Sequence, residues 1–302
     1  MNIGQREPRC ITVLCSLLGF SRQALYQKQL ETQRNALKED LLMQQIGRIR
    51  VLQKRVGGRK LLLMLNQFME QHTIEIGRDY FFDLLRENGL LIKPRKRSRP
   101  VTTNSWHHFH KFPNLILQFI PTAANQLWVC DITYINLHDD FAYLSLITDA
   151  YSRKITGFYL HKTLAAQGSV RALQMALKSL PPDHKLIHHS DRGTQYCCAE
   201  YVTVLQKSKI KISMTQSGDP LENAIAERVN GILKDELLEV KYPSFEKAQL
   251  AVAVAISTYN HHRLHSSVDM LTPVEAHQLK GTLKKHWKNY YIKQNEKEVT
   301  YA

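Results

Sequence analysis

Three acidic residues that lie far apart in the chain have the spacing that metal-dependent chemistry requires. Thirty-five residues separate Asp191 from Glu227, and Asp131 lies well upstream, inside an apolar run. Three carboxylates on separate elements are suited to hold two Mg²⁺ ions, which stand about 3.5–4 Å apart beside one phosphate in phosphoryl-transfer sites. Magnesium also prefers hard oxygen ligands. We therefore predict that these three acids are catalytic residues and metal ligands.

The sequence around the first two acids predicts strands. Asp131 interrupts an apolar, β-branched stretch over 126–135 that is typical of a buried strand. An unpaired carboxylate there would be costly, and a bound cation would favour its ionised form. Asp191 follows a short predicted strand that breaks at Gly193. Active sites in α/β sheets gather at such strand ends.

The third acid is predicted to lie near the start of a helix. Asp219 is placed to cap this helix, Pro220 fits its first turn, and Glu222 completes a capping box. Lys234 comes seven residues after Glu227, so both side chains should project from one helix face. We expect this lysine to hold DNA beside the metals.

Each acid also has an ordinary explanation when it is taken singly. Asp131 is compatible with a strand-edge acid, Asp191 with a turn residue, and Glu227 with one charge on a solvated helix face. Taken together, the acids have the order, the strand and helix contexts and the spacing from Glu227 to Lys234 that one shared site would require. This agreement favours one joint metal site over three unrelated acids.

At these residues the chain resembles the DDE transposases of bacterial insertion sequences, in particular the OrfB-type product of the insertion sequence family numbered three, within the retroviral integrase superfamily. The resemblance spans about residues 115 to 280. It is carried by residues 128–135, 147–153, 189–196, the Glu227 helix, 259–265 and 271–273. Three positions depart from the usual pattern: Glu222 stands where aspartate is common, Arg228 replaces a small polar residue, and Leu264 replaces a proline. None of them removes a predicted metal ligand.

The resemblance implies an RNase H-like catalytic core, which is an α/β fold with a mixed sheet. It implies DNA strand cleavage followed by strand transfer, with two Mg²⁺ ions, or Mn²⁺ in their place, held by Asp131, Asp191 and Glu227. Asp131 would bridge the two ions. Lys234 would contact DNA beside the cut phosphate.

Five further residues are predicted to support the three acids. They are His189, Gln195, Tyr196, Asn223 and Asn230. The first four are candidate neighbours of the cut phosphate, and each is equally compatible with local packing or capping. The fifth lies between Glu227 and Lys234 along the predicted helix.

The charge of the chain favours a polyanionic partner. Its 302 residues carry a net charge of +14. Residues 1–112 contain 20 Lys and Arg against 9 Asp and Glu, whereas residues 113–302 contain 21 against 18. Neutralised phosphates release counterions, which favours binding to nucleic acid. The basic first third is therefore a candidate DNA-binding region, although a membrane surface or ribosomal RNA would satisfy the total charge alone.

The rest of the composition indicates a globular protein. Hydrophobic residues make up 43% of the chain, an ordinary share. No run approaches the eighteen apolar residues of a membrane span, and the first residues lack the apolar segment of a signal peptide. We therefore expect a cytoplasmic, DNA-associated protein. The five cysteines lack metal-ligand spacing and are expected to be reduced thiols.

The basic first third is predicted to be helical. Residues 10–30 contain a helix, a glycine turn and a helix capped by Ser21, which fits either a helix-turn-helix or a hairpin that packs or oligomerises. Helices over about 31–55 and 78–90 follow, the latter ended by Gly89. A glycine turn with Arg59 and Lys60 lies between them, so we favour DNA binding by this region over mere packing.

A basic linker is predicted to join this region to the core. Its cations are Lys93, Arg95, Lys96, Arg97 and Arg99, and two prolines lie among them. This composition suits either a segment lying along phosphates or a solvated tether. The expected domains are a helical region over 1–92, the linker over 93–112, the catalytic core over 113–280 and a polar tail over 281–302, which is expected to be loosely held from residue 284.

The core is predicted to form a mixed α/β sheet. The expected strands are 126–135, 141–148, 154–161, 186–189 and 210–213, and the expected helices are 169–180, 199–207, one from Pro220, 245–260 and one from Pro273. The pattern alone leaves other α/β folds open.

Two other functions remain open from the sequence. One is an RNase H-like nuclease that nicks DNA without joining it, and the other is a non-catalytic DNA-binding regulator. Joining two transposon ends to target DNA requires two DNA-bound active sites, so we expect a homo-oligomer on double-stranded DNA. The resemblance also implies an OrfA-type upstream product as a partner or fusion.

Overall fold

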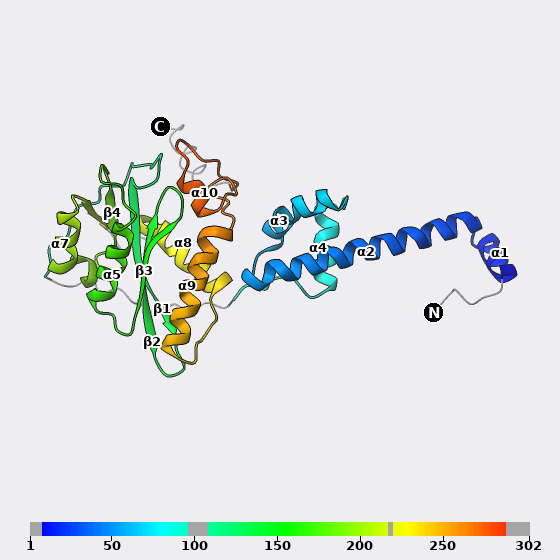
Figure 1. Ribbon diagram of the computed structural model, residues 1–302, viewed down its shortest axis with the longest axis horizontal. Coiled ribbons are helices and arrows are strands. Elements are labelled where there is room, and N and C mark those ends of the chain that lie inside the picture. The colour runs from blue at the N-terminus through cyan, green and yellow to red at the C-terminus, as the bar shows by residue number, and fades with distance from the viewer. Residues whose placement is uncertain (1–7, 96–107, 217–219, 288–302) are drawn as a thin grey trace, which may run out of the picture. The chain divides into compact units, whose positions relative to one another are not determined.

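The computed structural model describes residues 8–95, 108–216 and 220–287. The chain divides into two compact units, Met1–Lys93 and Pro94–Ala302 (Figure 1). None of the helices in the described ranges is long and apolar enough to cross a membrane. Three cations of the predicted linker, Lys96, Arg97 and Arg99, fall outside the described residues.

Within its described residues, the first unit contains four helices: α1 (Pro8–Leu17), α2 (Arg22–Leu52), α3 (Gly58–Gln71) and α4 (Arg78–Glu87). The Ser21 hydroxyl accepts a hydrogen bond from the backbone N–H of Ala24 at 3.1 Å, which confirms the predicted cap. The helix predicted from Ser21 and the one predicted over 31–55 are one continuous helix, because no glycine or proline interrupts residues 22–46.

The core of this unit forms where the second half of α2 meets α3 and α4. Its buried side chains are Leu42, Ile46, Val56, Leu61, Leu65, Ile74, Phe81, Leu84 and Leu85. Gly89 ends α4 as predicted, with a φ of +65°. The N–H of Leu90 then bonds the carbonyl of Leu85 at 2.7 Å, which satisfies a carbonyl of the last helical turn.

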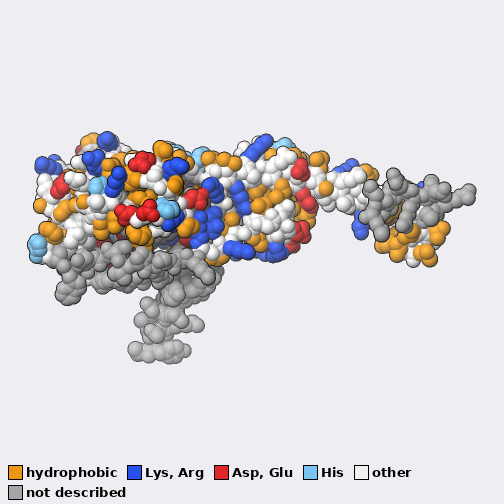
Figure 2. All heavy atoms as spheres, turned by 90° about the horizontal axis from the view of Figure 1, so that it is seen from below, with side chains coloured by type: hydrophobic (Ala, Val, Ile, Leu, Met, Phe, Trp, Pro, Cys, Tyr) orange, Lys and Arg blue, Asp and Glu red, His pale blue; other side chains and the backbone are white. Residues whose placement is uncertain are grey.

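The α1 end of the first unit exposes large hydrophobic side chains (Figure 2). Leu17 is 80% exposed and Phe20 is 64% exposed. Monomeric proteins seldom expose contiguous apolar surface of this kind. An exposed apolar surface is compatible with both interpretations of residues 10–30, a helix-turn-helix and an oligomerising hairpin, so both stay predictions.

The described part of the second unit is built around a five-stranded mixed sheet. Its strands are β1 (Leu127–Asn136), β2 (Phe141–Asp149), β3 (Ile155–His161), β4 (Ile187–Ser190) and β5 (Lys211–Met214), in the order β3-β2-β1-β4-β5. β1, β2 and β3 pair antiparallel through short turns, whereas β4 and β5 pair parallel and are reached by helical crossovers. This arrangement confirms the predicted RNase H-like mixed-sheet core.

Helices cover both faces of the sheet (Figure 1). They are α5 (Ala166–Leu177), α6 (Thr194–Cys197) and α7 (Ala199–Lys207) on one face, and α8 (Ala224–Ile232) and α9 (Phe245–His262) on the other. Trp128 and Cys130 pack with the first group, whereas Ile135 and Leu144 pack with the second. Alternate strand residues point to opposite faces, so the sheet separates two hydrophobic cores.

The helix that carries Glu227 begins later than predicted. Residues Pro220–Asn223 form a 3₁₀ turn, and α8 begins only at Ala224. The Asn223 side chain bonds the carbonyl of Cys130 on β1 at 2.9 Å and leaves the helix N–H groups uncapped. A contact with a distant strand therefore replaces the local cap.

The predicted capping box at this helix stays a prediction. The Glu222 carboxylate accepts a hydrogen bond from the backbone N–H of Gln216. Asp219, the predicted cap, lies outside the described residues. Two further differences are that the helix predicted over 169–180 is Ala166–Leu177, and that α8 continues into a π-helical turn over Leu233–Leu237.

The first part of the predicted tail is held against the core. The N–H of Gly281 bonds the carbonyl of Thr122 at 2.7 Å, and the N–H of His286 bonds the carbonyl of Ser266 at 2.7 Å. The expectation of a loosely held tail from residue 284 is therefore wrong at Lys284 and His286, whose backbone groups bond residues of the core. Residues 288–302 lie outside the described ranges.

The end of α9 is fastened to the sheet by side chains of the 259–265 motif. The Asn260 amide pairs with both the N–H and the carbonyl of Ile155, each at 3.0 Å, as a neighbouring strand would. The Tyr259 hydroxyl donates to the carbonyl of Arg153 at 3.0 Å. Arg263 makes two hydrogen bonds of 2.7 Å to Glu236 in the π-helical turn.

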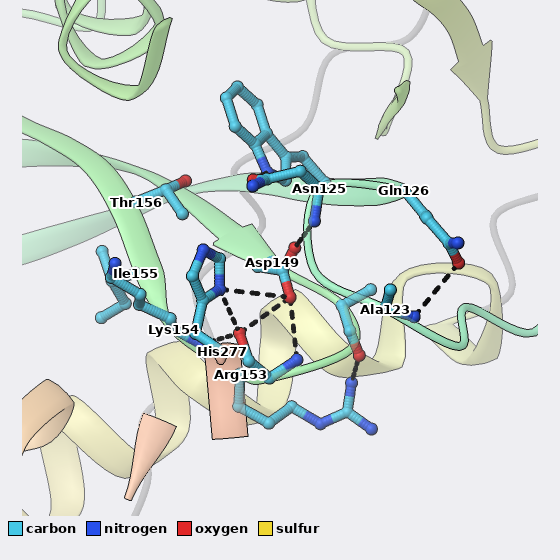
Figure 3. A network of polar contacts seen from close by, with 12 residues as sticks. Ala123, Asn125, Gln126, Asp149, Arg153, Lys154, Ile155, Thr156 and His277 are labelled. Carbon is cyan, nitrogen blue, oxygen red and sulfur yellow. Dashed lines mark hydrogen bonds and ion pairs between the residues drawn. The ribbon is translucent and has the colours of Figure 1, made fainter. Parts of the chain in front are cut away.

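A second buried network fixes the turn between β2 and β3 (Figure 3). The fully buried Asp149 accepts hydrogen bonds from the N–H of Asn125 at 2.7 Å and from the N–H of Ser152 at 2.8 Å. The Ser152 hydroxyl also bonds this carboxylate at 2.8 Å and lies 2.9 Å from His277 Nδ1 on the short helix α10 (Pro273–His277). The 147–153 motif is therefore a structural turn that ties the start of β1 to the C-terminal helix.

Gly157→Ala should destabilise the second unit. A Cβ at this position would lie 2.2 Å from the Ala172 carbonyl oxygen on α5, so strand and helix would have to separate. Overpacking of this kind costs about 1–3 kcal/mol, which urea unfolding followed by circular dichroism would measure. Gly47→Ala is the control, because nothing lies within 4 Å of its Cβ and alanine favours a helix. Unchanged stability of Gly157→Ala would contradict the close approach.

Glu236→Gln should lower the free energy of unfolding by about 3–5 kcal/mol, because it leaves a buried guanidinium without its counter-charge. The Arg263 side chain is 3% exposed and that of Glu236 is 24% exposed. Asp79→Asn is the matched control. The side chains of Asp79 and Arg78 are 84% and 68% exposed, so their ion pair should contribute nothing measurable to stability. Equal effects of the two substitutions would refute a structural role for the buried pair.

Candidate active site

The parallel pairing of β1 with β4 brings Asp131 and Asp191 together. Leu127, Trp128 and Val129 pair with Ile187, His188 and His189 in turn. Continued by two residues, this register sets Asp131 opposite Asp191, on the same face of the sheet. Both carboxyl groups line one pocket, which also includes Tyr134, Tyr143, Leu164, Gln195 and Tyr196.

Both carboxylates are oriented by backbone N–H groups. Asp131 Oδ1 accepts from the N–H of Ile132 at 2.8 Å, and Asp191 Oδ1 accepts from the N–H of Gly193 at 3.0 Å. Burial and then the negative charge of Asp191 raise the pKa of Asp131 to about 7. Hydrogen bonds from Asn230 and Ile132 act in the opposite direction, and the charge of Glu227 makes a smaller upward contribution.

Two asparagine side chains fasten the Glu227 helix over the first acid. Asn223 Nδ2 donates to the Cys130 carbonyl at 2.9 Å, and Asn230 Nδ2 donates to Asp131 Oδ2 at 2.7 Å. Asn230 follows Glu227 by three residues, so the two lie on one side of α8. Glu227 is exposed at the surface of this helix, within electrostatic reach of Asp131.

The donor set fits a divalent cation, although the three acids do not form a closed cage. In residues 8–95, 108–216 and 220–287, no three His, Cys, Asp or Glu side chains are grouped closely enough to hold a metal ion. Burial first, and then repulsion between the carboxylates, raise the pKa of Asp131. A cation reverses the penalty, and carboxylate oxygens are the ligands that Mg²⁺ prefers.

The predicted supporting residues have different surroundings. His189 is buried, with Nδ1 2.9 Å from Ser213 Oγ and Nε2 3.1 Å from the carbonyl of Glu222. Burial lowers the pKa of His189 to about 4, so its neutral ring braces β4 against β5 and the 3₁₀ turn. Gln195 and Tyr196 line the pocket of the two aspartates.

Gln195 and Tyr196 differ in how their polar atoms are satisfied. Gln195 Nε2 donates to the carbonyl of Leu164 at 2.9 Å, which fixes one wall of the pocket. The Tyr196 hydroxyl is buried without a hydrogen-bond partner among the described residues. Burial, with a further contribution from nearby negative groups, raises the pKa of Tyr196.

Lys234 lies in the π-helical turn with its ammonium nitrogen 3.9 Å from the centroid of the Tyr134 ring. Burial lowers the pKa of Lys234, and the negative charge of Asp131 raises it. The lysine that was predicted to accompany Glu227 is therefore close enough to the first acid to interact with it electrostatically.

The predicted DNA-binding cations of the first unit and the linker are not equivalent. Arg59 and Lys93 are exposed, whereas Lys60 is half-buried. Arg95 Nη1 donates to the carbonyls of Lys234 at 2.5 Å and Leu238 at 2.8 Å, so this guanidinium contacts the π-helical turn. Its position makes it a link between the linker and the site.

Sequence reasoning missed a buried polar cluster next to Asp131. His188 Nε2 lies 2.9 Å from Cys130 Sγ and 2.8 Å from the Tyr201 hydroxyl. Burial lowers the pKa of His188 to about 3, so its ring is neutral. The available signal was the His188–His189 pair in a short strand, which cannot reveal that the two rings point to opposite faces.

Sequence reasoning also missed the contact between Tyr134 and Lys234 and the ion pair between Arg263 and Glu236. Tyr134 and Arg263 belong to the two motifs, 128–135 and 259–265, that carried the resemblance. Motif membership was therefore the available signal. It does not identify the partner of either residue, which comes from a distant part of the chain.

Comparison with protein families finds two models described as integrase core domain, which match residues 121–220 and 208–273. The chain is 34% identical over 264 residues to the insertion element IS600 uncharacterized 31 kDa protein of Shigella sonnei, with 86% of this chain and 96% of that protein covered. It is 32% identical over 253 residues to the putative transposase for insertion sequence element IS986/IS6110 of Mycobacterium tuberculosis (strain CDC 1551 / Oshkosh), with 81% of this chain and 90% of that protein covered.

Among solved structures, the catalytic core domain of HTLV-2 integrase in complex with magnesium aligns with a TM-score of 0.43 and 19% identity, covering 53% of this chain and 100% of that one. The integrase-core matches and the two relatives, each covered over most of its length, confirm the resemblance stated from the motifs. The chain belongs to the insertion-sequence transposases with an integrase core domain, which are polynucleotidyl transferases.

Proposed function

We propose that the chain catalyses Mg²⁺-dependent cleavage and strand transfer of DNA, with Asp131, Asp191 and Glu227 as ligands of two metal ions. The observation that carries the proposal is the convergence of three elements on one acid. β4 sets Asp191 beside Asp131, and α8, which carries Glu227, is hydrogen-bonded to Asp131 through Asn230. The charges of both other acids act on Asp131.

The chain's own residues would orient the reacting groups. When bound, two Mg²⁺ ions supply the charge that activates a nucleophilic oxygen and stabilises the leaving oxygen of a phosphate. Asn230 and the N–H of Ile132 hold the Asp131 carboxylate in one orientation, and the N–H of Gly193 does the same for Asp191. Lys234 would bind a phosphate oxygen of the DNA beside the cut bond.

Double-stranded DNA, both transposon ends and target, is the proposed substrate, which places the protein with the bacterial DNA in the cytoplasm. Arg59 is exposed in the first turn of α3, where the helix dipole adds to its attraction for phosphate. We propose that this region and the linker bind DNA while the core cuts it. A homo-oligomer would supply the two active sites that joining two ends requires, and an OrfA-type product is a further proposed partner.

The rival functions make different predictions on the same substrate. A nuclease on this fold would nick DNA in Mg²⁺ without producing joined strands, and a regulator would bind DNA without either product. The three acids and Lys234 are all present, and Asp191, Glu227 and Lys234 each interact electrostatically with Asp131. An intact acid set favours catalysis over regulation alone.

Glu227→Gln should abolish Mg²⁺-dependent strand transfer while it leaves folding and DNA binding intact, because it removes one metal ligand without changing side-chain size. Asp131→Asn should behave alike. The assay is the appearance of joined product from a duplex that carries the end sequence of the chain's own element. Glu200→Gln, at an exposed acid on α7, is the control and should remain active. Retained turnover by Glu227→Gln would reject the assignment.

Lys234→Ala and Arg59→Ala should separate the two proposed DNA contacts. Loss of Arg59 should weaken DNA binding and reduce the slope of log affinity against log salt by about 1, since one phosphate contact disappears. Loss of Lys234 should reduce joining more than binding, because its contact lies at the cut phosphate. Fluorescence anisotropy across a salt series and the joining assay measure the two effects. Identical behaviour of the two variants would contradict this division.

A further inference from the structure

We propose that Tyr134 is a positioning residue for strand transfer, whose ring holds the ammonium group of Lys234 beside Asp131. The inference rests on the function proposed above, in which Lys234 contacts DNA next to the cut phosphate. It adds a residue that does not itself touch the reacting atoms and that acts through the lysine.

The contact has the geometry of a cation–π interaction. Lys234 Nζ lies 3.9 Å from the centroid of the Tyr134 ring, well inside the roughly 6 Å range over which a ring face attracts a cation. Both side chains are half-buried, so solvent weakens the attraction between the ring and the ammonium group only in part. Lysine has a flexible four-carbon chain, and contact with a fixed ring restricts where its charged end can lie.

A ring suits this task better than a carboxylate does. An ion pair with an acid would engage the N–H donors of the ammonium group, which would then have to break before a phosphate could bind. A ring face attracts the charge as a whole and forms no directional N–H···O bond with it. Lys234 is therefore kept near Asp131 while its donors stay available to a phosphate oxygen.

The ring is itself held in place. Phe141 on β2 packs edge-on against it, with ring centroids 5.7 Å apart and an interplanar angle of 86°. Tyr134 and Asp131 belong to the same strand, three residues apart, and Tyr134 pairs across to Tyr143 on β2. β1 therefore fixes the distance between the backbone positions of the acid and of the ring that holds the lysine.

The backbone beneath Lys234 is held from two sides. Arg95 donates to the carbonyls of Lys234 and Leu238, and Arg263 holds Glu236 in the same π-helical turn with two bonds of 2.7 Å. These contacts fix where the lysine side chain starts. The Tyr134 ring is the contact that fixes where it ends.

The test compares Tyr134→Leu with Tyr134→Phe in the full-length protein, using the Mg²⁺-dependent joining assay. The leucine variant should join DNA roughly 3- to 30-fold more slowly, the range expected when a cation–π contact is lost, and the phenylalanine variant should stay near the wild-type rate. In a Lys234→Ala background, Tyr134→Leu should cause no further loss. Independent, multiplicative losses from the two substitutions would overturn the proposal.

Tyr159→Leu is the matched control, because it removes a tyrosine ring that lies 5.2 Å from the Arg171 guanidinium, and neither residue lines the pocket of the two aspartates. Its joining rate should be unchanged. Circular dichroism and urea unfolding establish that each variant is folded. Tyr134→Met replaces the leucine variant if the latter does not fold, since methionine is flexible and also lacks a ring.

A second measurement does not depend on activity. Lysine acetylation by acetic anhydride in the DNA-free protein, followed by mass spectrometry, reports the accessibility of Lys234. Its rate should rise in Tyr134→Leu and stay low in Tyr134→Phe, with Lys178 as the internal reference. Unchanged labelling in Tyr134→Leu would overturn the proposal. If the variants show this labelling pattern but the wild-type protein joins no DNA, the proposed function is refuted. The contact between the Tyr134 ring and Lys234 is then still established.

Discussion

The parallel pairing of β1 with β4 is the constraint on which the site depends. Continued by two residues, it sets Asp131 opposite the residue that follows β4, so the distance between the two backbone positions follows from strand geometry. A slip of one residue would send Asp191 to the other face of the sheet. The neighbouring contacts protect this register: His189 bonds both β5 and the 3₁₀ turn, and Asn223 bonds the β1 backbone. The helix carrying the third acid is therefore positioned by the same pair of strands.

The parts of the fold that depend on local chemistry could be predicted from the sequence. Ser21 caps α2 and Gly89 ends α4 because each acts on its immediate neighbours. The five strands follow from runs of apolar and β-branched residues, and their predicted ranges agree with the structure to within one residue at every end. The start of α5 was misjudged because its N-cap position is Ala165, which forms no side-chain cap and gives no sequence signal.

The remaining differences arise from contacts between distant residues. The 3₁₀ turn before α8 exists because Asn223 bonds Cys130, 93 positions away in the chain, and no local pattern reports such a partner. His189 was a candidate neighbour of the phosphate or a packing residue, and the sequence does not show that its two ring nitrogens bond β5 and the turn. In the same way, the sequence predicts that Lys234 accompanies Glu227 but does not show that an aromatic ring on β1 contacts this lysine. Spacing identifies which residues take part, whereas three-dimensional packing decides what each of them does.

The fastening of α9 to β3 has a consequence for how copies of such genes decay. Asn260, Tyr259 and Arg263 hold the sheet and the π-helical turn from beyond the last of the three acids. A reading frame cut short by a stop codon after α8 would still encode all three acids. Its product would lack the residues that hold the start of β3 and the π-helical turn that carries Lys234. Surveys of genomes that score a mobile element as active from its acidic triad alone would count such relics as functional. An intact α9 is the additional criterion that separates the two.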